Sequence, residues 1–162
     1  MKEQNMVRGG IYGIIAGLVS TIVLDIASLI IFAVMGQSLA SFFALIGRSF
    51  LTFIGVEAAD PVWQGVTLHY SIGILTGLVL GLATQRFQKL RFISYGKGIL
   101  LGIIIAQIEG NALFYLMSVI LTIPPSEMLP IYGLGFVLHL IWGTCLGWII
   151  CYGQHMNCEG KL

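Results

Sequence analysis

Four ionisable side chains lie inside long apolar stretches, and they are the residues of this chain best suited to chemistry. They are Asp25, His69, Glu109 and His139. Placing such a group at the centre of a bilayer costs about 2.5–3.5 kcal/mol on insertion scales, so these residues usually face a bundle interior and serve a function. Two imidazoles and two carboxylates at membrane depth could hold a cofactor, bind a metal ion or pass protons.

The two histidines share a sequence context that suits a haem b. Each is followed by glycines four and eight residues later, at Gly73 and Gly77 after His69 and at Gly143 and Gly147 after His139. In a four-helix bundle with short connections, these two helices would be diagonal neighbours, and their histidines could ligate one iron from both sides. Gly73 and Gly143 would leave room for the macrocycle. The arrangement resembles the helix pairs of membrane cytochromes b, and it predicts an electron-transfer subunit.

Two other functions use the same four residues. A metal site of His69, His139, Asp25 and Glu109 would suit a divalent ion such as zinc, manganese or iron, although the Glu-x-x-His pattern of di-iron bundles is absent. A small cation- or proton-coupled transporter or channel could use them as a relay, extended by polar neighbours at Thr21, Ser28, Thr67, Gln107 and Asn111.

The simplest structural explanation is a pair of interhelical contacts without any ligand. Asp25 would bond His69, and Glu109 would bond His139, each contact contributing about 0.6 kcal/mol. The protein would then be a cofactor-free packing subunit of a membrane complex. Its glycine ridges would dock a partner or a second copy.

Composition identifies the elements that position these residues as membrane helices. Of 162 residues, 57% are hydrophobic and 9% are charged, whereas a soluble domain has about 25% charged residues. Four windows are long enough to span a bilayer, which takes about 20 residues. We therefore expect a single all-α transmembrane domain over 1–162, a polytopic bundle with helices near 10–35, 62–83, 98–123 and 130–152.

Charges and patterning in the loops predict the orientation. Most basic residues flank the termini and the middle loop, namely Lys2, Arg8, Arg86, Lys89, Arg91, Lys97 and Lys161. The positive-inside rule then places both termini in the cytoplasm, for a multi-pass protein of the cell (inner) membrane. The first outer loop carries an amphipathic pattern over 39–54, which predicts an interfacial helix or, as an alternative, a re-entrant segment.

An internal repeat predicts two tandem helical hairpins. Leu68-His69 with its glycines matches Leu138-His139, and Gly13 and Gly17 in the first helix match Gly98 and Gly102 in the third. A carboxylate follows in each half, Asp25 and Glu109, and we expect both to lie on the packed glycine ridge of their helix. Glycine every fourth residue also allows close helix packing without any functional repeat.

Other features exclude or narrow functions. The cysteines Cys145, Cys151 and Cys158 lack zinc-site spacing and are expected to be packing residues and one tail thiol. No nucleophile elbow, phosphate loop or Rossmann fingerprint is present, which argues against an enzyme. Net charge of +1 without a basic patch gives no sign of nucleic-acid binding.

The order of motifs resembles the YagU-type family of small bacterial inner-membrane proteins. The similarity runs from Gly65-Val66-Thr67-Leu68-His69 through 98–107 and the Pro124-Pro125 turn to His139. The family places its second-helix histidine one residue earlier and has a histidine near the position of Asn111. The resemblance implies a four-helix membrane protein with a suspected link to acid tolerance, and it implies no mechanism.

Overall fold

The chain folds into α-helices. The computed structural model describes residues 2–57, 60–87, 90 and 94–158. Within these residues there are five α-helices and no strand: α1 (Lys2–Val34), α2 (Leu39–Phe53), α3 (Val62–Arg86), α4 (Tyr95–Ile120) and α5 (Pro125–Cys158). Four of them are long and apolar enough to cross a membrane, whereas α2 is a shorter apolar helix. The predicted all-α class with four long apolar helices is confirmed.

The helix ends differ from the sequence-based expectation mainly in α1 and α5. α1 begins near the start of the chain, so its first turns carry polar residues beyond the apolar run. α5 begins at Pro125 and includes Pro130, which was expected to mark its start. Proline is tolerated in the first turn because those N–H groups lack helical partners, and Pro130 removes only one later bond. α5 also continues past Tyr152, so His155 lies in the helix and stacks on Tyr95.

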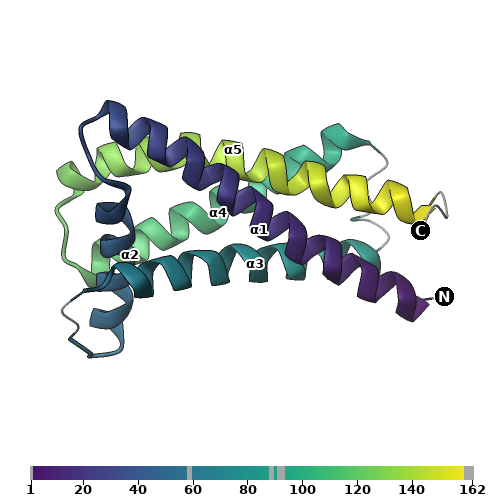
Figure 1. The fold of residues 1–162 in the computed structure, drawn as a ribbon, viewed down its shortest axis with the longest axis horizontal. Helices are drawn as coiled ribbons and strands as arrows, with labels where there is room; N and C mark the ends of the chain where they lie inside the picture. Colours follow the sequence, from purple (N-terminus) through teal and green to yellow (C-terminus); the bar gives the residue numbers. More distant parts are fainter. Residues whose placement is uncertain (1, 58–59, 88–89, 91–93, 159–162) are drawn as a thin grey trace.

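The two long hairpins lie side by side, with α2 across one end (Figure 1). α1 begins and α5 ends at the other end of the bundle. α1 packs against α3, α4 packs against α5, and the two hairpins meet through α1 and α5. The packing order is therefore α3–α1–α5–α4. α2 packs mainly on α3 and more lightly on α4 and α1.

Glycine seams bring the helices of each hairpin into close contact. In the first hairpin, a Cβ added at Gly13 would collide with the backbone of Gly77, and one at Gly17 with that of Gly73. In the second hairpin the same relation joins Gly147 to Gly98 and Gly143 to Gly102. These pairs match one another in the sequence repeat. Small residues allow such close backbone approach in lipid, and here the glycine ridges pack inside the chain.

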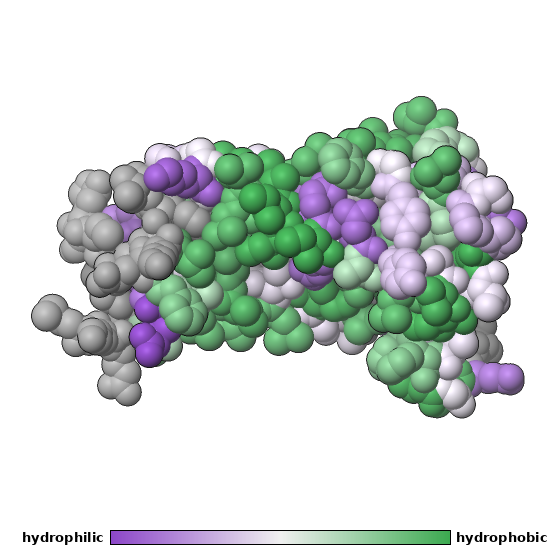
Figure 2. Space-filling model, turned by 180° about the vertical axis from the view of Figure 1, so that it is seen from behind, coloured by the Kyte–Doolittle hydropathy of each residue, from purple (hydrophilic) through white to green (hydrophobic). Residues whose placement is uncertain are grey.

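The surface between the two ends is apolar. Side chains such as Val79 and Leu129 are 63% and 73% exposed, while the interior holds Leu24, Leu138 and Leu146. Figure 2 shows this apolar surface, interrupted on the face seen there by a small hydrophilic patch. A soluble protein rarely exposes contiguous apolar surface of this extent. The fold is that of a membrane protein.

α2 is held in place by two glycine contacts near the start of α3. The Cβ position of Gly47 is filled by the carbonyl of Pro61, and that of Gly65 by the carbonyl of Phe43. Ser38 caps α2 by accepting a hydrogen bond from the Ala40 N–H at 3.2 Å. These contacts hold α2 across the end of α3.

Candidate functional site

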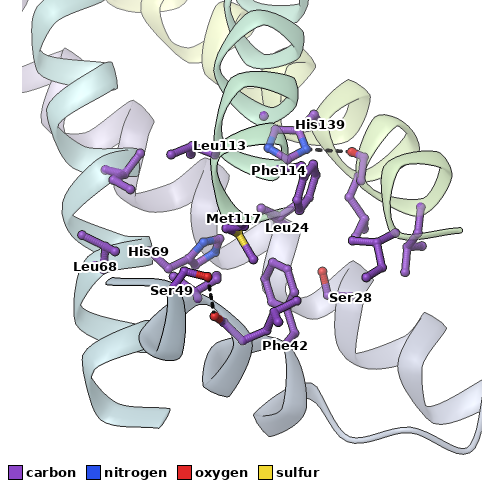
Figure 3. Close-up of a pocket in the computed structure, with 18 of the residues that line it drawn as sticks. Leu24, Ser28, Phe42, Ser49, Leu68, His69, Leu113, Phe114, Met117 and His139 are labelled. Carbon is purple, nitrogen blue, oxygen red and sulfur yellow. Dashed lines mark hydrogen bonds between the residues drawn. The ribbon is translucent and has the colours of Figure 1, made fainter. Parts of the chain in front are cut away.

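A cavity of about 520 Å³ lies between the helices (Figure 3). It lies beneath α2, that is, on the side of α2 that faces the long helices. All five helices contribute to its wall, which is mainly apolar. Three of the four residues singled out by the sequence, His69, Glu109 and His139, line it, and Asp25 lies behind His69. This volume falls in the range of about 300–1,000 Å³ that small-molecule pockets occupy.

The cavity ends at a floor near the middle of the bundle. The floor is formed by the innermost lining residue of each long helix: Thr21, Gly73, Glu109 and Trp142. The indole N–H of Trp142 donates to Thr21 Oγ1 at 3.2 Å, and that hydroxyl donates to the carbonyl of Gly17 at 2.8 Å. Beyond the floor, the glycine seams and residues such as Leu80 and Leu146 fill the bundle.

The opposite end of the cavity reaches the surface. Met35, Gln37 and Glu127 line it there and are exposed. Phe50 and Phe53 of α2 line the same region and are 38% and 71% exposed. The cavity is therefore closed toward the termini and accessible at the end that carries α2.

His69 is paired with Asp25 across α1 and α3. His69 Nε2 lies 3.1 Å from Asp25 Oδ1, and the two side chains are only 15% and 14% exposed. The imidazole also makes edge contacts with the rings of Phe42 and Phe43, whose centroids lie 6.0 and 5.6 Å away. The predicted Asp25–His69 contact is confirmed, and α2 covers it.

Glu109 does not pair with His139, so that prediction is wrong. Its Oε2 accepts a hydrogen bond from the hydroxyl of Thr76 at 2.9 Å, which links α4 to α3. The packed ridge of α4 continues at four-residue spacing through Gly98, Gly102 and Ala106 to Gly110. Glu109 precedes the last of these by one residue, or about 100° around the helix. Its side chain is therefore directed away from the α4–α5 seam toward α3.

His139 is packed between a carbonyl and a glycine. Its Nδ1–H donates to the carbonyl of Gly135, 2.7 Å away. The opposite edge of the ring, with Nε2, lies over Gly110 where a Cβ would be. When Gly13 and Gly17 are aligned with Gly98 and Gly102, Gly110 falls opposite Asp25. At equivalent positions of the repeat, His69 therefore contacts a carboxylate, whereas His139 contacts the backbone of a glycine.

The predicted metal site of four ligands is not formed. Among the residues that the structure describes, no three His, Cys, Asp or Glu side chains gather as metal ligands. Asp25 is held by His69, Glu109 reaches Thr76, and the free ring edge of His139 covers Gly110. Asp25 and His69 therefore pair with each other, whereas Glu109 and His139 bond to Thr76 and to the carbonyl of Gly135.

The haem prediction gains no support from this geometry. The two histidines line one cavity, but His69 Nε2 is bonded to Asp25 and His139 Nε2 faces the backbone of α4. An iron between them would require both rings to rotate. Gly143, expected beside the macrocycle, faces the backbone of Gly102 and Ile103, and the Cβ position of Gly73 is filled by Thr21.

Several site residues were not found from the sequence. Thr76 binds Glu109, Trp142 forms the floor, and Phe42 and Gly110 contact the two histidines. Gly110 carried a usable signal, since it extends the four-residue glycine series of α4. The cysteine expectation holds for the two side chains described: Cys145 is half-buried, Cys151 is buried, and both are free thiols. The side chain of Cys158 lies outside the described residues.

No family model, curated protein or solved structure matches this sequence. The resemblance to the YagU-type family therefore stays a prediction, and the function has to be inferred from the site.

Proposed function

We propose that this membrane protein binds a small, mainly apolar molecule in the cavity beneath α2. The observation that carries the proposal is a cavity of about 520 Å³ with mainly apolar walls and two convergent polar side chains, His69 and Glu109. Ligand pockets have this character, because apolar walls supply affinity and a few polar groups fix orientation. The molecule would enter at the end that carries α2.

The closed floor favours a carrier over a permanently open pore. Trp142 and Thr21 are bonded there, and Thr76 and Glu109 join α3 to α4 at a similar depth. Passage through the bundle would require the two hairpins to shift against each other at the α1–α5 contact. The tight glycine seams within each hairpin suit such a rigid-body movement.

We further propose that the cavity opens on the outer side of the cell membrane. Arg8, Arg86 and Lys97 lie at or near the helix ends opposite α2. Basic residues concentrate on the cytoplasmic side of membrane proteins. The termini would then be cytoplasmic and α2 would lie at the outer surface.

Saturable binding of a neutral probe tests the proposed function. Trp63 and Trp148 are exposed, so a Trp63→Phe/Trp148→Phe background leaves Trp142 at the cavity floor as the only tryptophan. In lipid nanodiscs, N-phenyl-1-naphthylamine should show saturable energy transfer from Trp142 above the linear signal of probe dissolved in lipid. An absorption spectrum of the same sample checks the haem hypothesis, since a Soret band would restore it.

Matched variants show whether the probe occupies the cavity. Leu113→Phe with Leu134→Phe fills the cavity from α4 and α5, and should weaken saturable binding at least tenfold. Leu100→Phe with Leu129→Phe adds the same groups to the exposed surfaces of the same helices and should leave binding unchanged. Equal binding by the two double variants, both folded by circular dichroism, would contradict the proposal.

A further inference from the structure

The charged groups around the cavity are unbalanced. Its lining includes two carboxylates, Glu109 at the floor and Glu127 at the mouth. No lysine or arginine of the described chain lines it. Of the two histidines that line the cavity with Glu109, His69 is already paired with Asp25 on α1, and His139 donates to Gly135 on α5. Neither histidine is left as a dedicated counter-charge.

Glu109 has only a neutral hydrogen-bond partner. The Thr76 hydroxyl satisfies one carboxyl oxygen, but it does not compensate a negative charge. An ionised carboxylate inside a membrane protein is strongly disfavoured unless a cation lies beside it. In the empty cavity Glu109 should therefore hold a proton, and a bound cation should replace that proton.

The aromatic side chains of the cavity wall suit an organic cation. Phe42, Phe114 and Trp142 line the cavity, and the Phe114 and Trp142 rings lie 5.7 and 6.5 Å from the His139 ring. Aromatic faces attract cations through their quadrupole, most strongly when the cation is poorly hydrated, as a quaternary ammonium is. A hydrated metal ion would gain little from such walls.

We propose that the ligand of this cavity is a lipophilic cation, and that Glu109 exchanges a proton for it. The inference rests on the proposed function, since it names the ligand class of the same cavity. On binding, the O–H bond of the Glu109 carboxyl group breaks, the electron pair stays on the carboxylate, and the proton leaves to water. No covalent bond to the ligand forms, and one proton is released for each cation bound.

Exchange of the Glu109 proton for the cation makes the affinity for the cation decrease as the pH is lowered. Protonated Glu109 competes with the cation, so affinity falls as pH is lowered through the range where Glu109 takes up its proton, by up to tenfold per pH unit. The part of this pH dependence that is lost in Glu109→Gln measures the exchange.

Two isosteric ligands test the proposal. Benzyltrimethylammonium and its neutral carbon isostere neopentylbenzene differ in charge but hardly in shape. Each is used to displace N-phenyl-1-naphthylamine from the protein in nanodiscs, and a pH indicator in weak buffer records proton release. We expect the cation to displace the probe with release of one proton. In Glu109→Gln, affinity for the cation should fall at least tenfold more than affinity for the neutral isostere.

Control variants separate this inference from a structural effect and from the proposed function. Glu127→Gln removes the exposed carboxylate at the mouth and should retain proton release, while Glu109→Asp should restore part of the cation affinity. Equal affinity for the two isosteres, or proton release retained in Glu109→Gln, overturns the cation proposal and leaves the cavity as an apolar site. If the unaltered chain shows no saturable probe binding, both the cation proposal and the proposed function are overturned.

Discussion

The two histidines of the repeat occupy equivalent positions but have different surroundings. His69 faces the carboxylate of Asp25, whereas His139 faces Gly110, which is at the matching position of the other hairpin. The first hairpin therefore has the polar pair Asp25–His69 beside the cavity, and the second has the His139 ring packed on Gly110. The polar chemistry of the site therefore comes from Asp25, His69 and Glu109, and His139 mainly shapes the wall.

Gly110→Ala should be destabilising by about 1–3 kcal/mol, the usual range for overpacking, because the new Cβ would occupy the space of the His139 ring. In Gly110→Ala/His139→Ala the conflict is absent, so the double variant should lose less stability than the sum of the single variants. Unfolding in mixed micelles measures this coupling. Gly133→Ala, on the open side of α5, is the control and should be near neutral. If the stability losses of the two single variants add up to the loss of the double variant, the His139 ring does not contact Gly110.

At the scale of elements, α2 completes the site. It supplies Phe42 and Phe43 against His69, and its Phe50 and Phe53 line the accessible end of the cavity. Its position depends on the close crossing of Gly47 and Gly65, where each glycine faces a backbone carbonyl of the other segment. A backbone atom cannot rotate away as a side chain can, so this crossing tolerates no added methyl group.

Gly65→Ala should loosen α2 while the four long helices stay folded. The methyl group would collide with the carbonyl of Phe43, and we expect a loss of about 1–3 kcal/mol in the docking of α2. Hydrogen exchange should rise across α2 and at the His69 segment. Gly96→Ala, in open space on α4, should be neutral or slightly stabilising, since alanine favours helix by about 0.5–1 kcal/mol over glycine. Unchanged protection of α2 in Gly65→Ala would mean that this crossing does not hold it.

At the scale of the whole molecule, the chain has two unlike halves. The half near the termini is closed by glycine seams, and the half near α2 holds the cavity. If α2 lies at the outer surface, as proposed, the cavity faces the outside and the basic helix ends face the cytoplasm.

Cysteine labelling tests this orientation. In a background with Cys145, Cys151 and Cys158 replaced by alanine, Val56→Cys between α2 and α3 should react with a membrane-impermeant maleimide in intact cells. Phe87→Cys, just after α3, should react only after the cells are permeabilised. The reverse pattern would place the cavity on the cytoplasmic side.

Sequence reasoning could predict the elements and part of the site for physical reasons. The length of an apolar run predicts a membrane helix, because a helix must be long and apolar enough to cross the hydrocarbon core. The four-residue glycine spacing predicted the close helix contacts at Gly13 and Gly98. The Asp25–His69 contact was one of the alternatives that the sequence offered, with Asp25 on the glycine ridge of its helix, and the structure contains it. Glu109 was misplaced because a shift of one residue turns a helical side chain by about 100°. Thr76 and Trp142 gave no signal in the sequence, because their roles depend on hydrogen bonds to residues of other helices. Thr76 bonds to Glu109, and Trp142 bonds to Thr21.

The glycine seams have a consequence for how this chain can vary. A seam position such as Gly17 or Gly102 allows a single residue type, because any side chain there would displace a neighbouring backbone. A wall position such as Leu113 or Ile131 borders empty space and allows many residue types without moving a helix. If the cavity binds a ligand, as proposed, substitutions that alter ligand preference are separated in space from those that break the bundle. The molecule can acquire a new specificity in its α2 half while the other half stays unchanged.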